Sequence, residues 1–229
     1  MTLQVVLRGS DGWVFASDRK TIAIKGVRAG SVVTKVHADL KRQVIWMTWG
    51  DSISDFAVDA LLKLIDQGHP LPVNNETEMR AFFRDFGNKL WEQALQDLAS
   101  NPEPLDPNPY RRGAFVFFIQ QPHWGWSWCI GRTSHADHAA GTYCNLGDTS
   151  SAALFFAERY ALRNAPVSKL TNLAAHIVLT GAILNSAGVE GIDLITYKLG
   201  DIDILDESQI DALRVRSAEI DKTIGDLFM

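Results

Sequence analysis

The chain has 229 residues, of which 46% are apolar, and a formal net charge of −5. This length and composition predict a soluble globular protein with a substantial buried core. The negative charge gives no electrostatic argument for binding nucleic acid or an anionic membrane, so we expect neither partner.

Two further features bear on location and redox chemistry. The sequence shows neither the pattern of a signal peptide nor an uninterrupted apolar run of membrane-spanning length, so we expect a cytoplasmic protein. Its two cysteines, Cys129 and Cys144, are too few for a disulfide framework. We expect both to be small buried residues within strands.

The first half of the chain begins with strands and continues with helices. Two pairs of strands are expected, 2–8 with 13–17 and 31–38 with 43–48. The turn between the first two is rich in Gly, Ser and Asp. Apolar residues then recur at three- and four-residue steps, which predicts helices over 53–64 and 79–98. Asp51 and Ser52 are candidate caps for the first helix.

The second half repeats this order after a proline-rich segment, 101–109, which we interpret as a long loop. Strands are expected over 115–120, 124–131 and 142–146. Asp148 or Thr149 is a candidate cap for a helix ending near Tyr160, and Ser168 for a helix running to Ala182. Strands over 192–197 and 202–205 follow, and residues 206–209 begin a closing helix.

Strands that occur in groups argue against a doubly wound parallel sheet, in which strands and helices alternate singly. We therefore predict an α+β fold forming a single domain over residues 1–229. Its architecture would be a four-layer α/β/β/α sandwich, with two antiparallel sheets face to face and helices outside each, because this arrangement buries every apolar stripe.

The residue behind Met1 offers chemistry of its own. If Met1 is removed, Thr2 carries both a hydroxyl nucleophile and a free α-amine that can serve as its base. Such a nucleophile needs a carboxylate and an ammonium nearby. Asp18 follows the second expected strand, and Lys35 lies in the third.

Several motifs in this order resemble the proteasome family of N-terminal nucleophile hydrolases over essentially the whole chain. They are Thr2, Phe-Ala-Ser-Asp-Arg-Lys (15–20), Thr-Lys-Val (34–36), Trp-Gly-Asp-Ser-Ile-Ser-Asp-Phe (49–56), Asn-Leu-Gly-Asp-Thr-Ser-Ser-Ala-Ala (145–153) and Ser-Ala-Gly-Val-Glu-Gly-Ile-Asp-Leu-Ile-Thr-Tyr (186–197). The bacterial members, including the HslV-type peptidase, are the more similar ones.

The resemblance implies a role for each matching residue. Thr2 would be the nucleophile and its amine the general base. Lys35 would lower the pKa of that amine and of the hydroxyl, and Asp18 would keep Lys35 charged. Ser150 would hydrogen-bond the terminal amine. Backbone N–H groups of a loop formed by Thr48, Trp49 and Gly50 would hold the oxyanion.

The activity implied is that of a threonine-type endopeptidase in a homo-oligomeric ring. Its substrate would be a peptide or an unfolded protein, an unfolding ATPase is a possible partner, and no cofactor is expected. Two alternatives stay open. One is a non-catalytic assembly subunit that keeps Met1, in which Asp18 and Lys35 form a structural ion pair and Ser150 caps a helix. The other is an amidohydrolase acting on a small amide.

Two other groups of residues have simpler interpretations. Trp124, Trp126 and Trp128 share one face of a strand, which is more typical of a core or subunit interface than of a ligand platform. His135, Asp137 and His138 could ligate a metal, but a metal site needs three or four convergent ligands and no further one is evident. We therefore expect these three in a loop and no metal.

Overall fold

The protein is described by a computed structural model that covers residues 2–20, 33–50, 53–71, 75–100, 113–119, 124–130, 135–138, 143–147, 151–161, 164–185, 189–198 and 200–227. The chain divides into two compact units. Unit 1 comprises Met1–Gln43 and Gly141–Met229, and unit 2 comprises Val44–Ala140. The expectation of a single domain over 1–229 stays a prediction.

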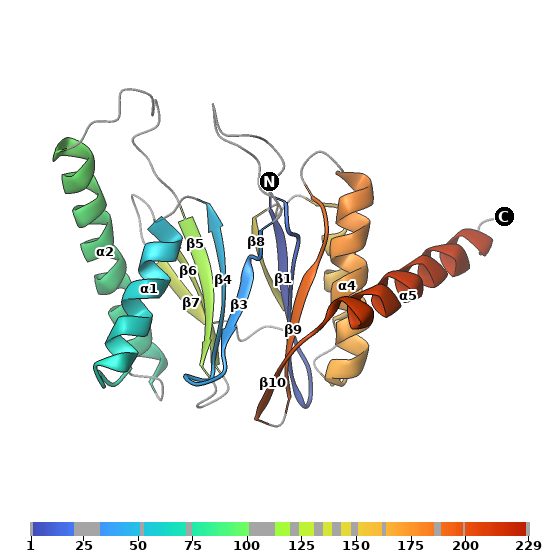
Figure 1. Ribbon diagram of the computed structural model, residues 1–229, viewed down its shortest axis with the longest axis horizontal. Helices are drawn as coiled ribbons and strands as arrows, with labels where there is room; N and C mark the ends of the chain where they lie inside the picture. Colours follow the sequence, from blue (N-terminus) through green and yellow to red (C-terminus); the bar gives the residue numbers. More distant parts are fainter. Residues whose placement is uncertain are drawn as a thin grey trace. The chain divides into compact units, whose positions relative to one another are not determined.

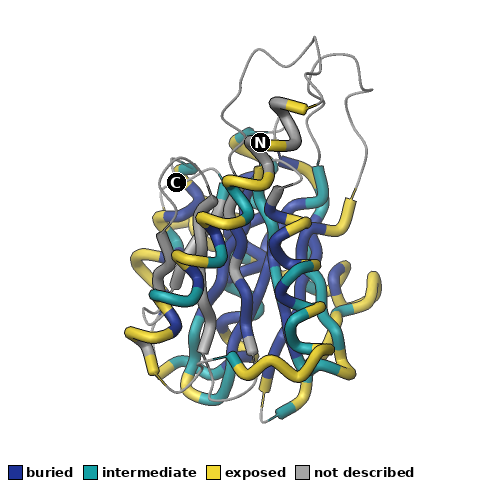
Figure 2. Tube along the Cα trace, turned by 90° about the vertical axis from the view of Figure 1, so that its left-hand side faces the viewer, coloured by how far each residue is buried: buried dark blue, intermediate teal, exposed yellow. Residues whose placement is uncertain are grey.

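Unit 1 contains a five-stranded antiparallel sheet with the strand order β10-β9-β2-β1-β8. Its strands are β1 (Leu3–Arg8), β2 (Gly12–Ser17), β8 (Tyr143–Gly147), β9 (Asp193–Lys198) and β10 (Asp201–Ile204). The apolar residues of β1 and β2 are at most 3% exposed. Figure 2 shows buried residues in dark blue along the chain. The first strand of the chain therefore lies inside a sheet, between β2 and β8, rather than at its edge.

Three helices belong to unit 1: α3 (Leu154–Tyr160), α4 (Val167–Leu184) and α5 (Glu207–Asp226). Helix α4 contacts β1, β2 and β9 and shares the unit's apolar core with them (Figure 1). Gly181 lets this helix approach β1 closely, because a Cβ there would come within 2.3 Å of the Leu3 side chain. His176 joins α4 to α5, with its Nδ1 2.9 Å from Ser217 Oγ.

Helix α4 is long and apolar enough to cross a membrane by length and composition alone. It is not the uninterrupted apolar run that the sequence expectation concerned, since Lys169, Asn172 and His176 lie within it. Its packing explains its apolar character, since Leu170, Ala174, Ile177 and Val178 are buried in the core of unit 1. A helix that covers a sheet needs this composition without any lipid.

The first residues of the helices show that one sequence prediction is wrong and that another is confirmed. Helix α4 begins at Val167, so Ser168 lies inside it instead of capping it. The cap comes from a distant turn, because Asp11 accepts the Val167 N–H at 2.7 Å. The predicted start of the closing helix is confirmed by a reciprocal capping box between Asp206 and Gln209. Helix α3 begins at Leu154, and the cap candidates Asp148 and Thr149 lie outside the described residues.

The described part of unit 2 contains strands and helices from the middle of the chain. They are β4 (Val44–Gly50), α1 (Ile53–Asp66), α2 (Glu76–Ser100), β5 (Gly113–Ile119), β6 (Trp124–Ile130) and β7 (His135–His138). The second sheet has the order β3-β4-β5-β6-β7, with β3 at Val36–Asp39. Helix α1 contacts β4 and β5, and α2 contacts β6 and β7. The apolar core between them includes Phe83 and Phe115, whose rings meet edge to face at 6.1 Å.

These elements confirm the predicted fold class: α+β, with two antiparallel sheets flanked by helices. Two strand predictions differ from the structure. Strand β3 begins at Val36, whereas the sequence suggested a start at Ser31. Residues His135–His138, expected in a loop, form β7 and pair with β6. The three tryptophans lie in β6 as expected, and the proline-rich segment 101–109 lies outside the described residues.

Candidate active site

Thr2 lies directly before β1, between the ends of two neighbouring strands. The register pairs Leu3 with Gly147 of β8 and Gln4 with Ser17 of β2. Gly147 has φ +87°, and a Cβ at this position would come within 2.0 Å of the Thr2 carbonyl oxygen. Only glycine therefore permits this backbone conformation and this approach to Thr2.

Lys35 points its ammonium at Thr2. Its Nζ lies 3.1 Å from Thr2 Oγ1 and 2.7 Å from Asp18 Oδ2, and it also donates to the carbonyl oxygen of Lys20. An ammonium has three N–H donors, so these three acceptors use all of them. The residue as a whole is 7% exposed. The structure thus brings together Thr2, Asp18 and Lys35, as the sequence predicted.

Asp18 is wholly buried at the end of β2 and is held by backbone groups. Its Oδ1 accepts the Leu3 N–H at 2.7 Å, and its Oδ2 accepts the Lys20 N–H at 3.0 Å as well as the Lys35 ammonium. Its own N–H donates to the Leu3 carbonyl oxygen at 3.1 Å. The carboxylate is therefore locked against the residue that follows Thr2.

Burial acts on both members of this ion pair in the directions expected for charged groups out of water. Desolvation raises the pKa of Asp18, and this effect is opposed by Lys35 and by the N–H groups of Leu3 and Lys20. Desolvation likewise lowers the pKa of Lys35, opposed by Asp18 and by the more distant carboxylate of Asp193. Lys35 therefore releases its proton at a lower pH than a lysine in water does.

This geometry can activate a hydroxyl. Because the Lys35 ammonium donates to Thr2 Oγ1, it stabilises negative charge that develops on this oxygen. The hydroxyl proton then needs a base. The α-amine of Thr2 is attached to the same residue, and it becomes available once Met1 has been removed.

The other predicted site residues belong to strand β4 or lie outside the described residues. Thr48, Trp49 and Gly50 do not form a loop: they are the last three residues of β4 and pair with β5 opposite Phe115, Ala114 and Gly113. Strand β4 continues through these positions because its pairing with β5 keeps the same register there. It ends at Gly50, which has φ +94°. Their role with an oxyanion stays a prediction.

Two further predictions concern Ser150 and the possible metal ligands in 135–138. Ser150 lies outside the described residues. His135, Asp137 and His138, considered as metal ligands, contribute their backbone to β7.

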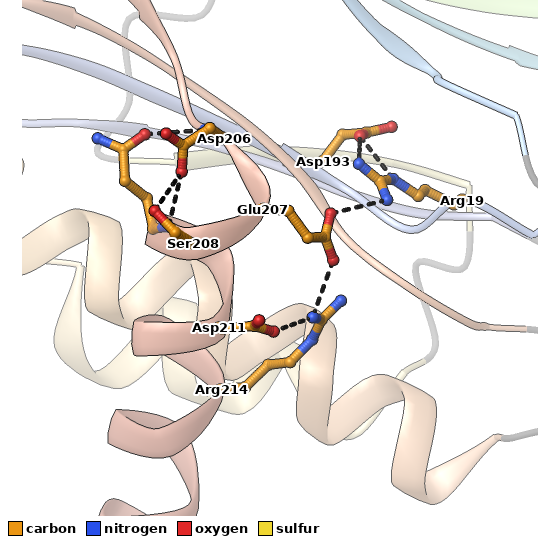
Figure 3. Close-up of polar contacts among 8 residues, drawn as sticks. Arg19, Asp193, Asp206, Glu207, Ser208, Asp211 and Arg214 are labelled. Carbon is orange, nitrogen blue, oxygen red and sulfur yellow. Dashed lines mark hydrogen bonds and ion pairs between the residues drawn. The ribbon is translucent and has the colours of Figure 1, made fainter.

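Two features next to the site were not singled out from the sequence. Gly147 carries a local signal, because a glycine that ends a strand often marks a positive φ. The second feature is the contact of Arg19 with Asp193 and Glu207 (Figure 3). It carries no local signal, since Asp193 lies 174 residues further along the chain.

Comparison with protein-family models finds no match, and comparison with curated proteins finds none. Solved structures do match. Anbu (ancestral beta-subunit) from Yersinia bercovieri aligns with a TM-score of 0.70 at 15% identity, covering 99% of this chain and 96% of the other. Two structures of Anbu from Hyphomicrobium sp. strain MC1, one of them a Gly-1 mutant, align with TM-scores of 0.67 and 0.68 at 15% and 16% identity. They cover 99% and 100% of this chain and 96% of theirs.

The fold is that of a proteasome-like β-subunit. At this low identity the similarity shows the fold alone. It also corrects one sequence-based expectation: the structures it finds are Anbu proteins, which are proteasome-like but are not HslV, so the assignment to the HslV type is wrong.

Proposed function

We propose that this chain is an N-terminal nucleophile hydrolase in which Thr2, once freed from Met1, cleaves peptide bonds. The observation that carries the proposal is the contact of the Lys35 ammonium with Thr2 Oγ1 at 3.1 Å, supported by Asp18 on the other side of Nζ. The proteasome-like fold is consistent with this chemistry.

The reaction would proceed in two steps. Thr2 Oγ1 attacks the carbonyl carbon of the substrate amide, and its proton passes to the α-amine of Thr2 and from there to the leaving nitrogen. This step forms an acyl ester on Thr2 and releases an amine. Water then attacks the ester, giving a carboxylic acid and restoring the hydroxyl. An α-amine has a pKa of about 8, so roughly a tenth of it is neutral at pH 7 and can accept a proton.

The adjacent ammonium would assist in both steps. Lys35 would lower the pKa of the α-amine by charge repulsion, which increases the neutral fraction that can accept a proton. Its hydrogen bond to Oγ1 would strengthen as negative charge develops there. Asp18 would hold Lys35 in place through its own backbone hydrogen bonds.

We further propose that the chain works as a subunit of a homo-oligomeric assembly that admits peptides or unfolded polypeptides, with an unfolding ATPase as a possible partner. The proteasome-like β-subunit fold supports this proposal. Enclosure of the site would protect other proteins from a peptidase that selects little. Sedimentation velocity of the purified protein tests it: a monomer at micromolar concentration would contradict it.

Intact-mass spectrometry of the purified full chain, before and after incubation with a peptide β-lactone, tests the catalytic proposal. We expect a chain without Met1, and then a gain equal to the whole mass of the lactone, because ring opening by Oγ1 releases no leaving group. Thr2→Ala should show no gain. A chain that keeps Met1 and forms no adduct would instead indicate the non-catalytic assembly subunit. Adduct formation without cleavage of any peptide would favour an amidohydrolase that acts on a small amide.

A further inference from the structure

The segment 18–20 forms one wall of the candidate site. The side chain of Asp18 and the carbonyl oxygen of Lys20 both accept hydrogen bonds from Lys35. Arg19 is the residue between them. Its N–H donates to the Glu190 carbonyl oxygen and its own carbonyl accepts the Val33 N–H, each at 2.8 Å. Arg19 thus ties this wall to the chain before β9 and to the chain before Lys35.

The side chain of Arg19 makes a forked contact with one carboxylate oxygen. Its Nε and Nη2 each lie 2.6 Å from Asp193 Oδ1, as Figure 3 shows. Asp193 is the first residue of β9 and is 9% exposed. Gly191 lies against the same arginine side chain with φ +67°, and a Cβ there would approach it to 3.2 Å. The arginine is therefore held by charge and by close packing together.

The contact continues to the start of α5, though more weakly. Arg19 Nη1 lies 3.5 Å from Glu207 Oε2, and Glu207 also pairs with Arg214 at 3.0 Å (Figure 3). The Glu207 side chain is 58% exposed, whereas that of Asp193 is only 11% exposed. Exposed ion pairs contribute little to stability, so the inner pair of Arg19 and Asp193 determines how segment 18–20 is held.

We propose that Arg19 and Asp193 are positioning residues of the threonine site: their partly buried ion pair holds segment 18–20 so that Asp18 and Lys20 present their oxygens to Lys35. The effect on reaction rate rests on the proposed function, whereas the effect on Lys35 does not.

Asp193 also acts on Lys35 through space. Its carboxylate raises the pKa of Lys35, in the same direction as Asp18 does. Among the described residues, the charged side chains next to this pair include Glu207, which contacts Arg19, and Lys20, whose Nζ lies 3.4 Å from Glu190.

Removal of Asp193 and removal of Arg19 should therefore shift the pKa of Lys35 in opposite directions. Asp193→Asn removes a negative charge and leaves Arg19 without this partner, so Lys35 should lose its proton at lower pH. Arg19→Gln leaves the Asp193 carboxylate uncompensated, so Lys35 should hold its proton to higher pH. These opposite shifts report the charges of the pair, and the positioning of segment 18–20 is measured separately below.

The experiment measures the rate at which a peptide β-lactone acylates Thr2 of the full chain, followed by intact mass from neutral to alkaline pH. Asp193→Asn and Arg19→Gln should each lower the maximal rate by about tenfold or more, because a misplaced catalytic group costs rate steeply. Their alkaline limbs should shift in opposite directions. Arg19→Lys, which keeps a charge without the fork, should recover part of the rate. Arg216→Gln, on the exposed side of α5, should change neither quantity.

A second measurement keeps the outcome clear if the wild type is not acylated at all. The pKa of Lys35 can be followed by NMR of the 15N-labelled ammonium in wild type, Asp193→Asn and Arg19→Gln, which requires no reaction. Opposite shifts would show only that the charges of the pair reach Lys35. The positioning role is followed by the amide signals of Leu3 and Lys20, whose N–H groups donate to Asp18 and should shift in both variants even where the catalytic proposal has failed. Amide signals of Leu3 and Lys20 that match the wild type in both variants overturn the positioning role. If Asp193→Asn does not fold, the comparison of Arg19→Gln with Arg19→Lys, which keeps the positive charge, carries the test.

Discussion

The two units bury different kinds of side chain. In unit 1 the described residues include eight buried polar or charged ones: Gln4, Ser17, Asp18, Lys35, His176, Asp193, Thr196 and Ser217. Among the described residues of unit 2 the corresponding set is Ser54, and the core is built on aromatic and aliphatic groups such as Phe83 and Phe115. Burying a charge is costly unless it is paired, and such an arrangement is typical of functional sites. The contrast places the buried ion pair, and with it the candidate site, in unit 1.

Replacement of Lys35 should give the largest effect. Lys35→Met leaves Asp18 buried without its cation, which should cost about 3–5 kcal/mol of unfolding free energy. Loss of the ammonium should also slow acylation of Thr2 by about a thousandfold. Urea unfolding and the β-lactone rate measure the two effects.

A double variant separates stability from catalysis at this position. Lys35→Met with Asp18→Asn removes both charges and keeps a side-chain oxygen for the Leu3 N–H, so it should regain part of the lost stability while acylation stays slow. A double variant that is stable and also reacts at the wild-type rate would show that the pair is structural only.

Removal of a large aromatic side chain from unit 2 should have a comparable effect on stability alone. Phe83 is wholly buried, so Phe83→Ala should cost about 3–5 kcal/mol. The acylation rate per folded molecule should match the wild type. Phe83→Leu provides a milder change if the first variant does not fold. A tenfold slower reaction in the fully folded variant would contradict the expectation that Phe83 affects stability alone.

The approach of β8 to Thr2 can be tested at a single glycine. Gly147→Ala should displace Thr2 and slow acylation by about a hundredfold, because small misplacements of a nucleophile are costly. Gly68→Ala is a matched control. Gly68 also has a positive φ, +72°, but no atom lies within 4 Å of its added Cβ. Both variants should lose about 1–3 kcal/mol through backbone strain, and only Gly147→Ala should lose activity.

The dependence of the rate on pH should show the smallest effect. The reaction needs a neutral α-amine, which sets the acid limb, and a charged Lys35, which sets the alkaline limb. Since burial lowers the pKa of Lys35, the rate should begin to fall at a pH below the ordinary lysine value of about 10.4. Acylation measured in a series of buffers checks this. An alkaline limb at or above that value would indicate that the ammonium is not the group involved.

Much of the fold could be predicted because its signals are local. The turn before β2, the helical periodicity of apolar residues in α2 and the capping box at Asp206 can each be identified from residues close together in the sequence. The errors occurred where distant parts of the chain decide the outcome. Asp11 caps α4 from 156 residues away, which no local pattern at Ser168 could indicate. Strand β7 is only four residues long, and its pairing with β6 outweighs the loop-like composition around it.

The candidate site shows the same division. The meeting of Thr2, Asp18 and Lys35 could be expected from the resemblance, since the motifs of a family preserve its long-range contacts. The pair of Arg19 and Asp193 was not expected, because it joins residues 174 positions apart and the resemblance was used only for Thr2, Asp18, Lys35, Ser150 and the oxyanion loop. Thr48, Trp49 and Gly50 were expected in a loop because the resemblance implied one, whereas their pairing with β5 extends the strand.

The location of Thr2 between two strands has a consequence for synthesis. Thr2 directly precedes β1, whereas the glycine against it comes from β8 and the carboxylate that pairs with Arg19 comes from β9. A chain that is still being synthesised would therefore carry the hydroxyl without the neighbours that place it. The candidate site would form only after β8 and β9 have joined the sheet.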